Sequence, residues 1–219
     1  MTSRRRTPPD ADPARLHRAA SFGLKHGFSY DEIVPMLEAL VAASAPGSEH
    51  WLFAQTKLAE VMVERAPWRA AVAARAAIAH SPDDDTPRAL LALALTLLGH
   101  YNAAARAYRE ALAIAPDNPW YAHNLGHMLD FAMHRPHEAV PLLRASHARE
   151  PHVEIAASLA HALGRVGRIS EAKRVLRRAL RGDDAPSEEH RALLEWLEAG
   201  APTSAAGKPV LGDRVLGRK

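Results

Sequence analysis

Four histidines lie close together in the stretch WYAHNLGHMLDFAMHRPHEA, which runs from Trp120 to Ala139. His123 and His127 are four residues apart, so on a helix both imidazoles lie on the same face. Asp130 follows on the next turn, and His161 lies 34 residues after His127. Three imidazole nitrogens, with a carboxylate as a fourth ligand or as a hydrogen-bond partner, form a donor set that can hold zinc. The spacing therefore allows a metal site made by these three histidines.

The same histidines fit equally well as polar residues of a binding surface that holds no metal. Their H-x-x-x-H spacing lacks the catalytic glutamate of the metalloprotease motif. The sequence also has no recognisable pair of nucleophile and base, and no GxGxxG or GxxxxGK phosphate loop. Cysteine is absent, which excludes disulfides, thiolate nucleophiles and cysteine-based metal centres. We therefore expect a binding protein that is not an enzyme and needs no cofactor, with metal binding as an alternative.

The helices expected to position these residues belong to a sequence repeat of fixed length. Four similar stretches end in a proline at spacings of 34, 35 and 35 residues, at Pro82, Pro116, Pro151 and Pro186. A period of this size is typical of solenoids, in which each unit stacks on its neighbour to bury a shared core. Within one period, Thr86 to Ala115, apolar residues recur at helical spacing on both sides of a break at Gly99. The sequence therefore predicts an all-α protein made of helix pairs.

The residues at fixed positions of the period resemble the tetratricopeptide repeat family over about Trp51 to Gly182. The second unit carries the most complete set of matching residues: Leu91, Ala92, Gly99, Tyr101, Ala104, Tyr108, Ala111 and Pro116. The resemblance implies an α-solenoid, a right-handed superhelix of about four helix pairs, with a concave groove lined by the first helix of each pair.

The segments on either side of the repeats look like supports for the array. Asp12 is in position to cap a first helix, and Ser29 with Glu32 has the spacing of a capping box. The stretch PSEEHRALLEWLEAG is amphipathic and is expected to turn Leu193, Leu194 and Leu197 inward. We expect a flexible basic arm at 1–11, an N-terminal helical pair at 12–50, repeats at 51–185, a capping helix at 186–200 and a disordered tail at 201–219.

The resemblance also predicts which residues line the groove. These are Leu93, Leu97, Trp120, His123, His127, Asp130, Phe131, His161 and Arg165. A mixture of apolar and polar groups suits a protein segment with a few apolar anchors, docked as a peptide or helix. Since free histidine titrates near 6.5, we expect binding to change between about pH 5.5 and 7.5. The family's clamp for C-terminal carboxylates is absent, because Ala89 and Glu154 stand where that clamp has lysines.

The composition of the chain indicates which classes of partner and which cellular location to expect. The longest apolar run, Ala89 to Gly99, is shorter than the roughly 18 residues of a membrane span, and the basic N-terminus is not a secretory signal. The basic stretch Lys173 to Arg181 has no interleaved aromatic residues, so we do not expect nucleic acid as a partner. We expect a cytoplasmic scaffold or adaptor that binds protein and can self-associate. The alternatives are a histidine-lined metal-binding solenoid and a secretion-type chaperone for one client.

Overall fold

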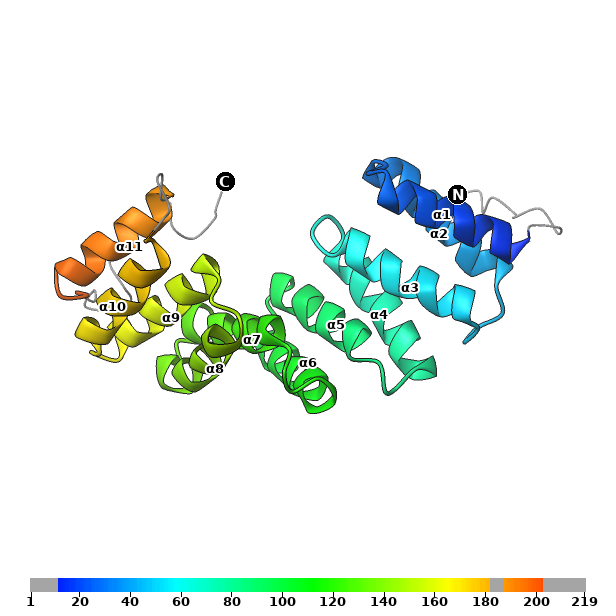
Figure 1. The fold of residues 1–219 in the computed structure, drawn as a ribbon. Coiled ribbons are helices and arrows are strands. Elements are labelled where there is room, and N and C mark those ends of the chain that lie inside the picture. The colour runs from blue at the N-terminus through cyan, green and yellow to red at the C-terminus, as the bar shows by residue number, and fades with distance from the viewer. Residues whose placement is uncertain (1–11, 182–186, 203–219) are drawn as a thin grey trace. The chain divides into compact units, whose positions relative to one another are not determined.

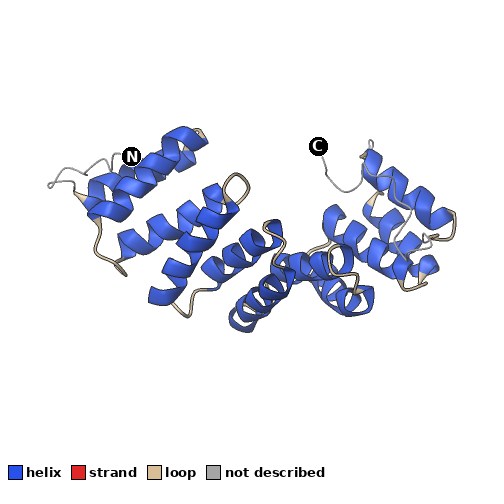
Figure 2. Cartoon of the chain, turned by 180° about the vertical axis from the view of Figure 1, so that it is seen from behind, coloured by secondary structure: helices blue, strands red, loops and turns tan. Residues whose placement is uncertain are grey.

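The computed structural model describes residues 12–181 and 187–202, which form helices joined by loops (Figures 1 and 2). The predicted basic arm and nearly all of the predicted tail lie outside these residues. The eleven helices of the described residues are α1 (Pro13–Lys25), α2 (Tyr30–Ala43), α3 (Glu49–Met62), α4 (Pro67–His80), α5 (Asp85–Leu97), α6 (Tyr101–Ile114), α7 (Pro119–Phe131), α8 (Pro136–Arg149), α9 (Val153–Arg165), α10 (Ile169–Ala179) and α11 (Glu188–Glu198).

The helices begin where the sequence supplies acceptors for the free backbone N–H groups of a first turn. Asp12 Oδ1 accepts a hydrogen bond from the Ala14 amide at 3.0 Å, and the capping box of Ser29 and Glu32 is present at the start of α2. Both caps were predicted. At the start of α7, Asn118 Oδ1 accepts from the amides of Trp120 and Tyr121. This cap fixes the first turn of the helix that carries the histidine-rich stretch.

The chain divides into two compact units, and the boundary falls between Pro116 and Asp117. In the first unit, α1 to α6 pack consecutively, and α3 also contacts α1 and α5. Leucines such as Leu37 and Leu40 fill its core, while buried alanines such as Ala70 and Ala74 let the helices approach closely. The boundary lies inside the segment 51–185, in which the sequence predicts one uninterrupted array.

In the second unit, α7 to α10 pack consecutively, and α11 packs on both α9 and α10. Because α7 also contacts α9, the helices α7, α9 and α11 lie in a row. Gly164 allows the close approach of α11, since a Cβ atom there would lie only 2.5 Å from Cζ3 of Trp196. The buried face of α11 consists of Leu193, Trp196 and Leu197, whereas Leu194, which was predicted to point inward, is only half-buried.

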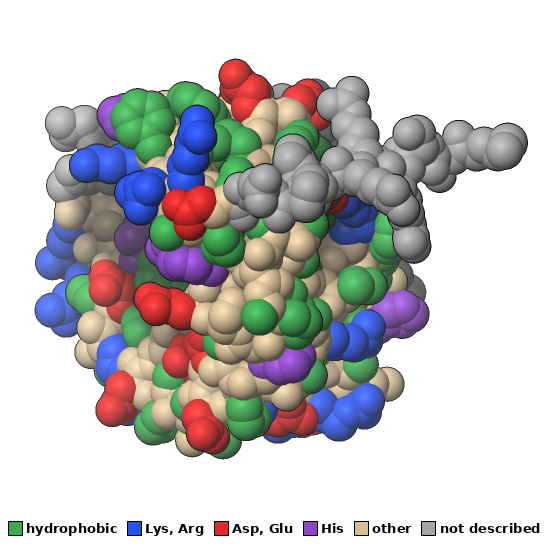
Figure 3. Space-filling model, turned by 90° about the vertical axis from the view of Figure 1, so that its right-hand side faces the viewer, with side chains coloured by type: hydrophobic (Ala, Val, Ile, Leu, Met, Phe, Trp, Pro, Cys, Tyr) green, Lys and Arg blue, Asp and Glu red, His purple; other side chains and the backbone are tan. Residues whose placement is uncertain are grey.

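The packing of consecutive helices confirms the predicted all-α solenoid architecture of helix pairs. No helix within the described residues is both long and apolar enough to cross a membrane. The surface seen from the side of α1 and α2 mixes hydrophobic side chains with charged ones of both signs (Figure 3).

Candidate functional site: a histidine-lined pocket in the second unit

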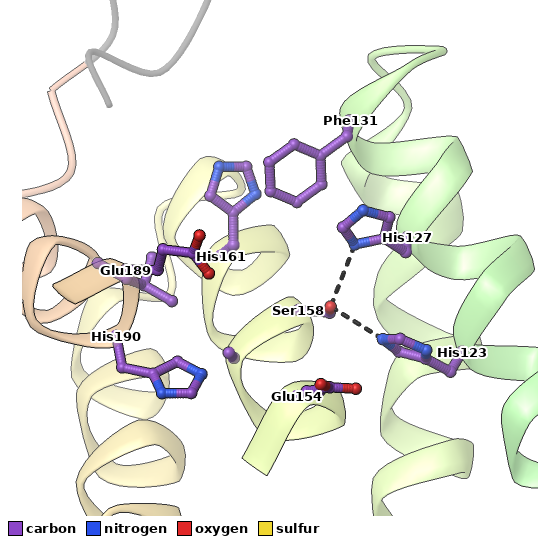
Figure 4. Close-up of a pocket in the computed structure, with 10 residues that line it drawn as sticks. His123, His127, Phe131, Glu154, Ser158, His161, Glu189 and His190 are labelled. Carbon is purple, nitrogen blue, oxygen red and sulfur yellow. Dashed lines mark hydrogen bonds between the residues drawn. The ribbon is translucent and has the colours of Figure 1, made fainter. Parts of the chain in front are cut away.

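A pocket of about 290 Å³ lies in the second unit, where α7, α9 and α11 come together (Figure 4). Its walls combine imidazoles, carboxylates and apolar side chains. The lining residues are His123, His127 and Phe131 from α7, Glu154, Ala157, Ser158 and His161 from α9, and Glu189, His190 and Leu193 from α11.

A continuous stack of flat rings crosses this region. The ring of Phe131 lies between two imidazoles, with centroid distances of 4.5 Å to His127 and 4.1 Å to His161. His161 in turn stacks against Trp196 of α11 at 5.3 Å. Trp120 contacts His123 edge-on at the other end of α7. The stack connects α7, α9 and α11, and it fixes the positions of the rings that form part of the pocket wall.

A buried polar cluster supports the stack. The Nδ1 atom of His161 donates to Oδ2 of Asp130 at 2.5 Å, and Arg165 Nη1 donates to Oδ1 of the same carboxylate at 2.9 Å. Asp130 is fully buried and His161 is 2% exposed. The guanidinium of Arg165 also donates to the backbone carbonyl of Asp130. A carboxylate buried in this way is stabilised only by such charged and hydrogen-bonded neighbours, so the three residues act as one unit.

A second polar group bridges the two histidines of α7. The Oγ atom of Ser158 lies 3.0 Å from Nε2 of His123 and 3.2 Å from Nδ1 of His127, as the dashed lines in Figure 4 mark. A hydroxyl has one hydrogen, so it donates to one imidazole and accepts from the N–H of the other. This chain of hydrogen bonds suits two neutral imidazoles and fixes their orientation.

Both histidines of α7 resist protonation. Burial, together with the nearby imidazoles of His123 and His161 and opposed by Asp130, lowers the pKa of His127 to about 4. The residue as a whole is exposed, but its imidazole packs against Phe131 and Ser158 in the pocket lining. Burial is also the main cause of the lowered pKa of His123. With this pKa, His127 is neutral throughout the window of pH 5.5 to 7.5, and the predicted pH dependence of binding stays a prediction.

The arrangement does not support the predicted metal site of His123, His127 and His161. Within the described residues, no group of three or more potential ligands is arranged to hold a metal ion. Instead, Ser158 bridges the imidazoles of His123 and His127, and Asp130 binds that of His161. These groups also do not form a Ser–His–Asp triad, because the histidine that contacts Asp130 is not one that contacts Ser158.

The sequence profile of the tetratricopeptide repeat family matches residues 88–118, which span most of α5 and all of α6. Among solved structures, that of MamA protein superimposes with a TM-score of 0.66 at 16% identity, covering 78% of this chain and 92% of MamA. The tetratricopeptide repeat protein TTC0263 from Thermus thermophilus gives a TM-score of 0.61 at 18% identity, covering 86% of this chain and 98% of TTC0263. The chain thus contains a match to the tetratricopeptide repeat and has the fold of tetratricopeptide repeat proteins. A search of curated proteins found no match.

Seven of the nine residues predicted to line the groove of the tetratricopeptide array lie in the second unit. His123, His127, Phe131 and His161 line the pocket, and Trp120 lies near it with 39% of its surface exposed. Asp130 is buried beneath the pocket with Arg165, where it holds His161, so it does not present its carboxylate to solvent. Leu93 and Leu97 lie on α5 of the first unit, and Leu97 is 51% exposed.

Several residues of the site were not predicted. Ser158 gave no signal, because a single serine in an apolar helix has no motif. Glu189, His190 and Trp196 belong to the helix that was interpreted only as a cap. Trp196 was the detectable case, since it lies at helical spacing between the predicted core residues Leu193 and Leu197.

Proposed function

We propose that this protein is a non-enzymatic scaffold whose second unit holds a segment of a partner protein in the pocket between α7, α9 and α11. The observation that carries the proposal is a concave site whose wall groups are already held in place by the ring stack and the buried cluster. Rigid walls reduce the entropy lost on binding, and a few oriented polar groups among apolar ones give specificity.

The lining residues supply two kinds of contact. Phe131, Ala157 and Leu193 offer apolar surface to a side chain that enters the pocket. The neutral imidazoles of His123 and His127 offer hydrogen bonds in an orientation fixed by Ser158. Trp120, which is partly exposed, is the proposed anchor for the segment that leads into the pocket.

Leu93 and Leu97 are proposed to contact partners separately, through the first unit. We do not propose a metal-binding role, because no group of three or more potential ligands within the described residues is arranged to hold a metal ion. The chaperone role for a single client, self-association and the cytoplasmic location stay predictions.

A library of random displayed peptides, screened against the intact chain, tests the proposal. In the variant Ala157→Leu the added side chain fills the pocket without changing charge. The matched control is Ala76→Leu, which makes the same change in a pocket of about 200 Å³ in the first unit. We expect selected peptides to lose at least tenfold in affinity with Ala157→Leu and to keep it with Ala76→Leu. Peptides that bind both variants equally well, or a library that yields no binder, would contradict the proposal.

A further inference from the structure

We propose that the side chain that enters the pocket of the second unit is positively charged, an arginine or lysine of the partner segment held between Glu154 and Glu189. The inference rests on the proposed function and specifies the chemistry of its partner. Among the described residues, the groups that line the pocket include these two carboxylates and no lysine or arginine. Figure 4 shows Glu154 and Glu189 on different sides of the pocket, one on α9 and the other on α11.

Several other carboxylates of the second unit are paired with a cation. Asp117 pairs with Arg149, Glu171 with Arg144 and Arg168, and Glu198 with Arg177. Within the described residues, neither Glu154 nor Glu189 has an ion pair. Each lies in the first turn of its helix, where a carboxylate stabilises the helix dipole. That effect explains a glutamate at each position, but not why both line one pocket.

Two of the imidazoles that line the pocket do not compensate this negative charge. His123 and His127 have lowered pKa values because they are buried, so at neutral pH they add no positive charge. The guanidinium of Arg165 is bound to buried Asp130 and is not part of the pocket lining. A cation therefore meets two carboxylates and neutral imidazoles without repulsion from these groups.

The apolar part of the pocket fits the rest of such a side chain. Arginine and lysine bury their methylene stems against apolar groups while the charged end contacts polar ones. Phe131, Ala157 and Leu193 provide that apolar surface, and the carboxylates lie in the same lining.

The peptides selected for pocket binding provide the test. We expect arginine or lysine at one position in most of them, and replacing that residue by uncharged citrulline or glutamine should weaken binding about tenfold. The double variant Glu154→Gln/Glu189→Gln should weaken binding by a similar factor, which corresponds to about 1.4 kcal/mol. The control Glu188→Gln/Glu195→Gln removes the same charge from exposed residues of α11 that do not line the pocket, and should change affinity less than twofold.

Charge reversal separates this inference from the proposed function. Glu154→Lys/Glu189→Lys should turn the preference toward peptides with an aspartate or glutamate. Peptides that Ala157→Leu excludes, but that carry no conserved cation and bind Glu154→Gln/Glu189→Gln normally, would overturn the cation preference and leave pocket binding intact. Peptides indifferent to Ala157→Leu would overturn both.

Discussion

The two units place different chemistry at equivalent positions of the repeat. Leu93, His127 and His161 follow one another at intervals of 34 residues, on α5, α7 and α9. In the first unit this position holds a leucine, whereas in the second it holds imidazoles that line a pocket. The first helices of the pairs therefore have a shared role in packing, and their variable positions decide whether a unit offers an apolar surface or a polar pocket.

Even the two histidines at this position differ. His161 is buried and bonded to Asp130, while His127 lies at the surface of the pocket and is bonded to Ser158. The difference arises because α11 covers α9 and brings Trp196 onto the ring of His161. The position of a residue in the repeat thus predicts which way its side chain points. The packing of neighbouring helices then determines how buried that side chain is and what it binds.

The largest expected effect comes from Asp130. Asp130→Ala removes the partner of two buried groups, His161 and Arg165, and should lower the free energy of unfolding of the second unit by about 3–5 kcal/mol. The equivalent residue of the first unit is Thr96, whose hydroxyl donates to the Ala92 carbonyl of its own helix. Thr96→Ala should cost about 1 kcal/mol or less. Denaturant unfolding of both variants measures the difference, and equal costs would contradict the structural role of the cluster.

Gly164→Ala should reduce the free energy of unfolding by less than Asp130→Ala, and its effect should be concentrated in α11. The added methyl group would meet Trp196 and Leu197 within 2.8 Å, so α11 must shift away from α9. We expect a loss of about 1–3 kcal/mol. Amide hydrogen exchange should become faster in α11 and stay unchanged in α3. Unchanged protection of α11 would show that the contact is not a tight one.

The pH dependence distinguishes His127 from an ordinary imidazole. Its NMR signal should titrate with a midpoint near pH 4 instead of about 6.5. Because the folded state then binds fewer protons than the unfolded state between these values, stability should be full above about pH 6.5 and fall as the pH drops toward 4. His127→Gln should reduce that fall. A midpoint near 6.5 would show that the imidazole remains hydrated.

The smallest effect is expected at Leu97. Its side chain is half exposed on α5, so Leu97→Ala should change stability by no more than about 0.5 kcal/mol. Phe131 occupies the equivalent position of the second unit and lies between two imidazoles, so Phe131→Ala should cost several times more. Thermal unfolding of the two variants compares them directly. Similar shifts would contradict the difference between the units.

Local rules predicted the fold better than the site. The proline period, helical spacing and caps at Asp12 and Ser29 depend on near neighbours in the chain, and the structure has helices where they predict them. The repeat register also brought His123, His127 and His161 to one region. The pocket itself depends on how α11 returns to α9, and on Ser158 and Asp130 binding specific imidazoles. Such contacts between distant segments leave no periodic signal in the sequence.

The indole N–H signals of the four tryptophans test the central claim most directly, because each unit contains two. Trp51 and Trp68 lie in the first unit, and Trp120 and Trp196 lie at the ring stack of the second. On titration with a selected arginine-containing peptide, the signals of Trp120 and Trp196 should shift while those of Trp51 and Trp68 stay in place. Shifts of the highly exposed Trp68 without shifts of Trp196 would contradict binding in the histidine-lined pocket.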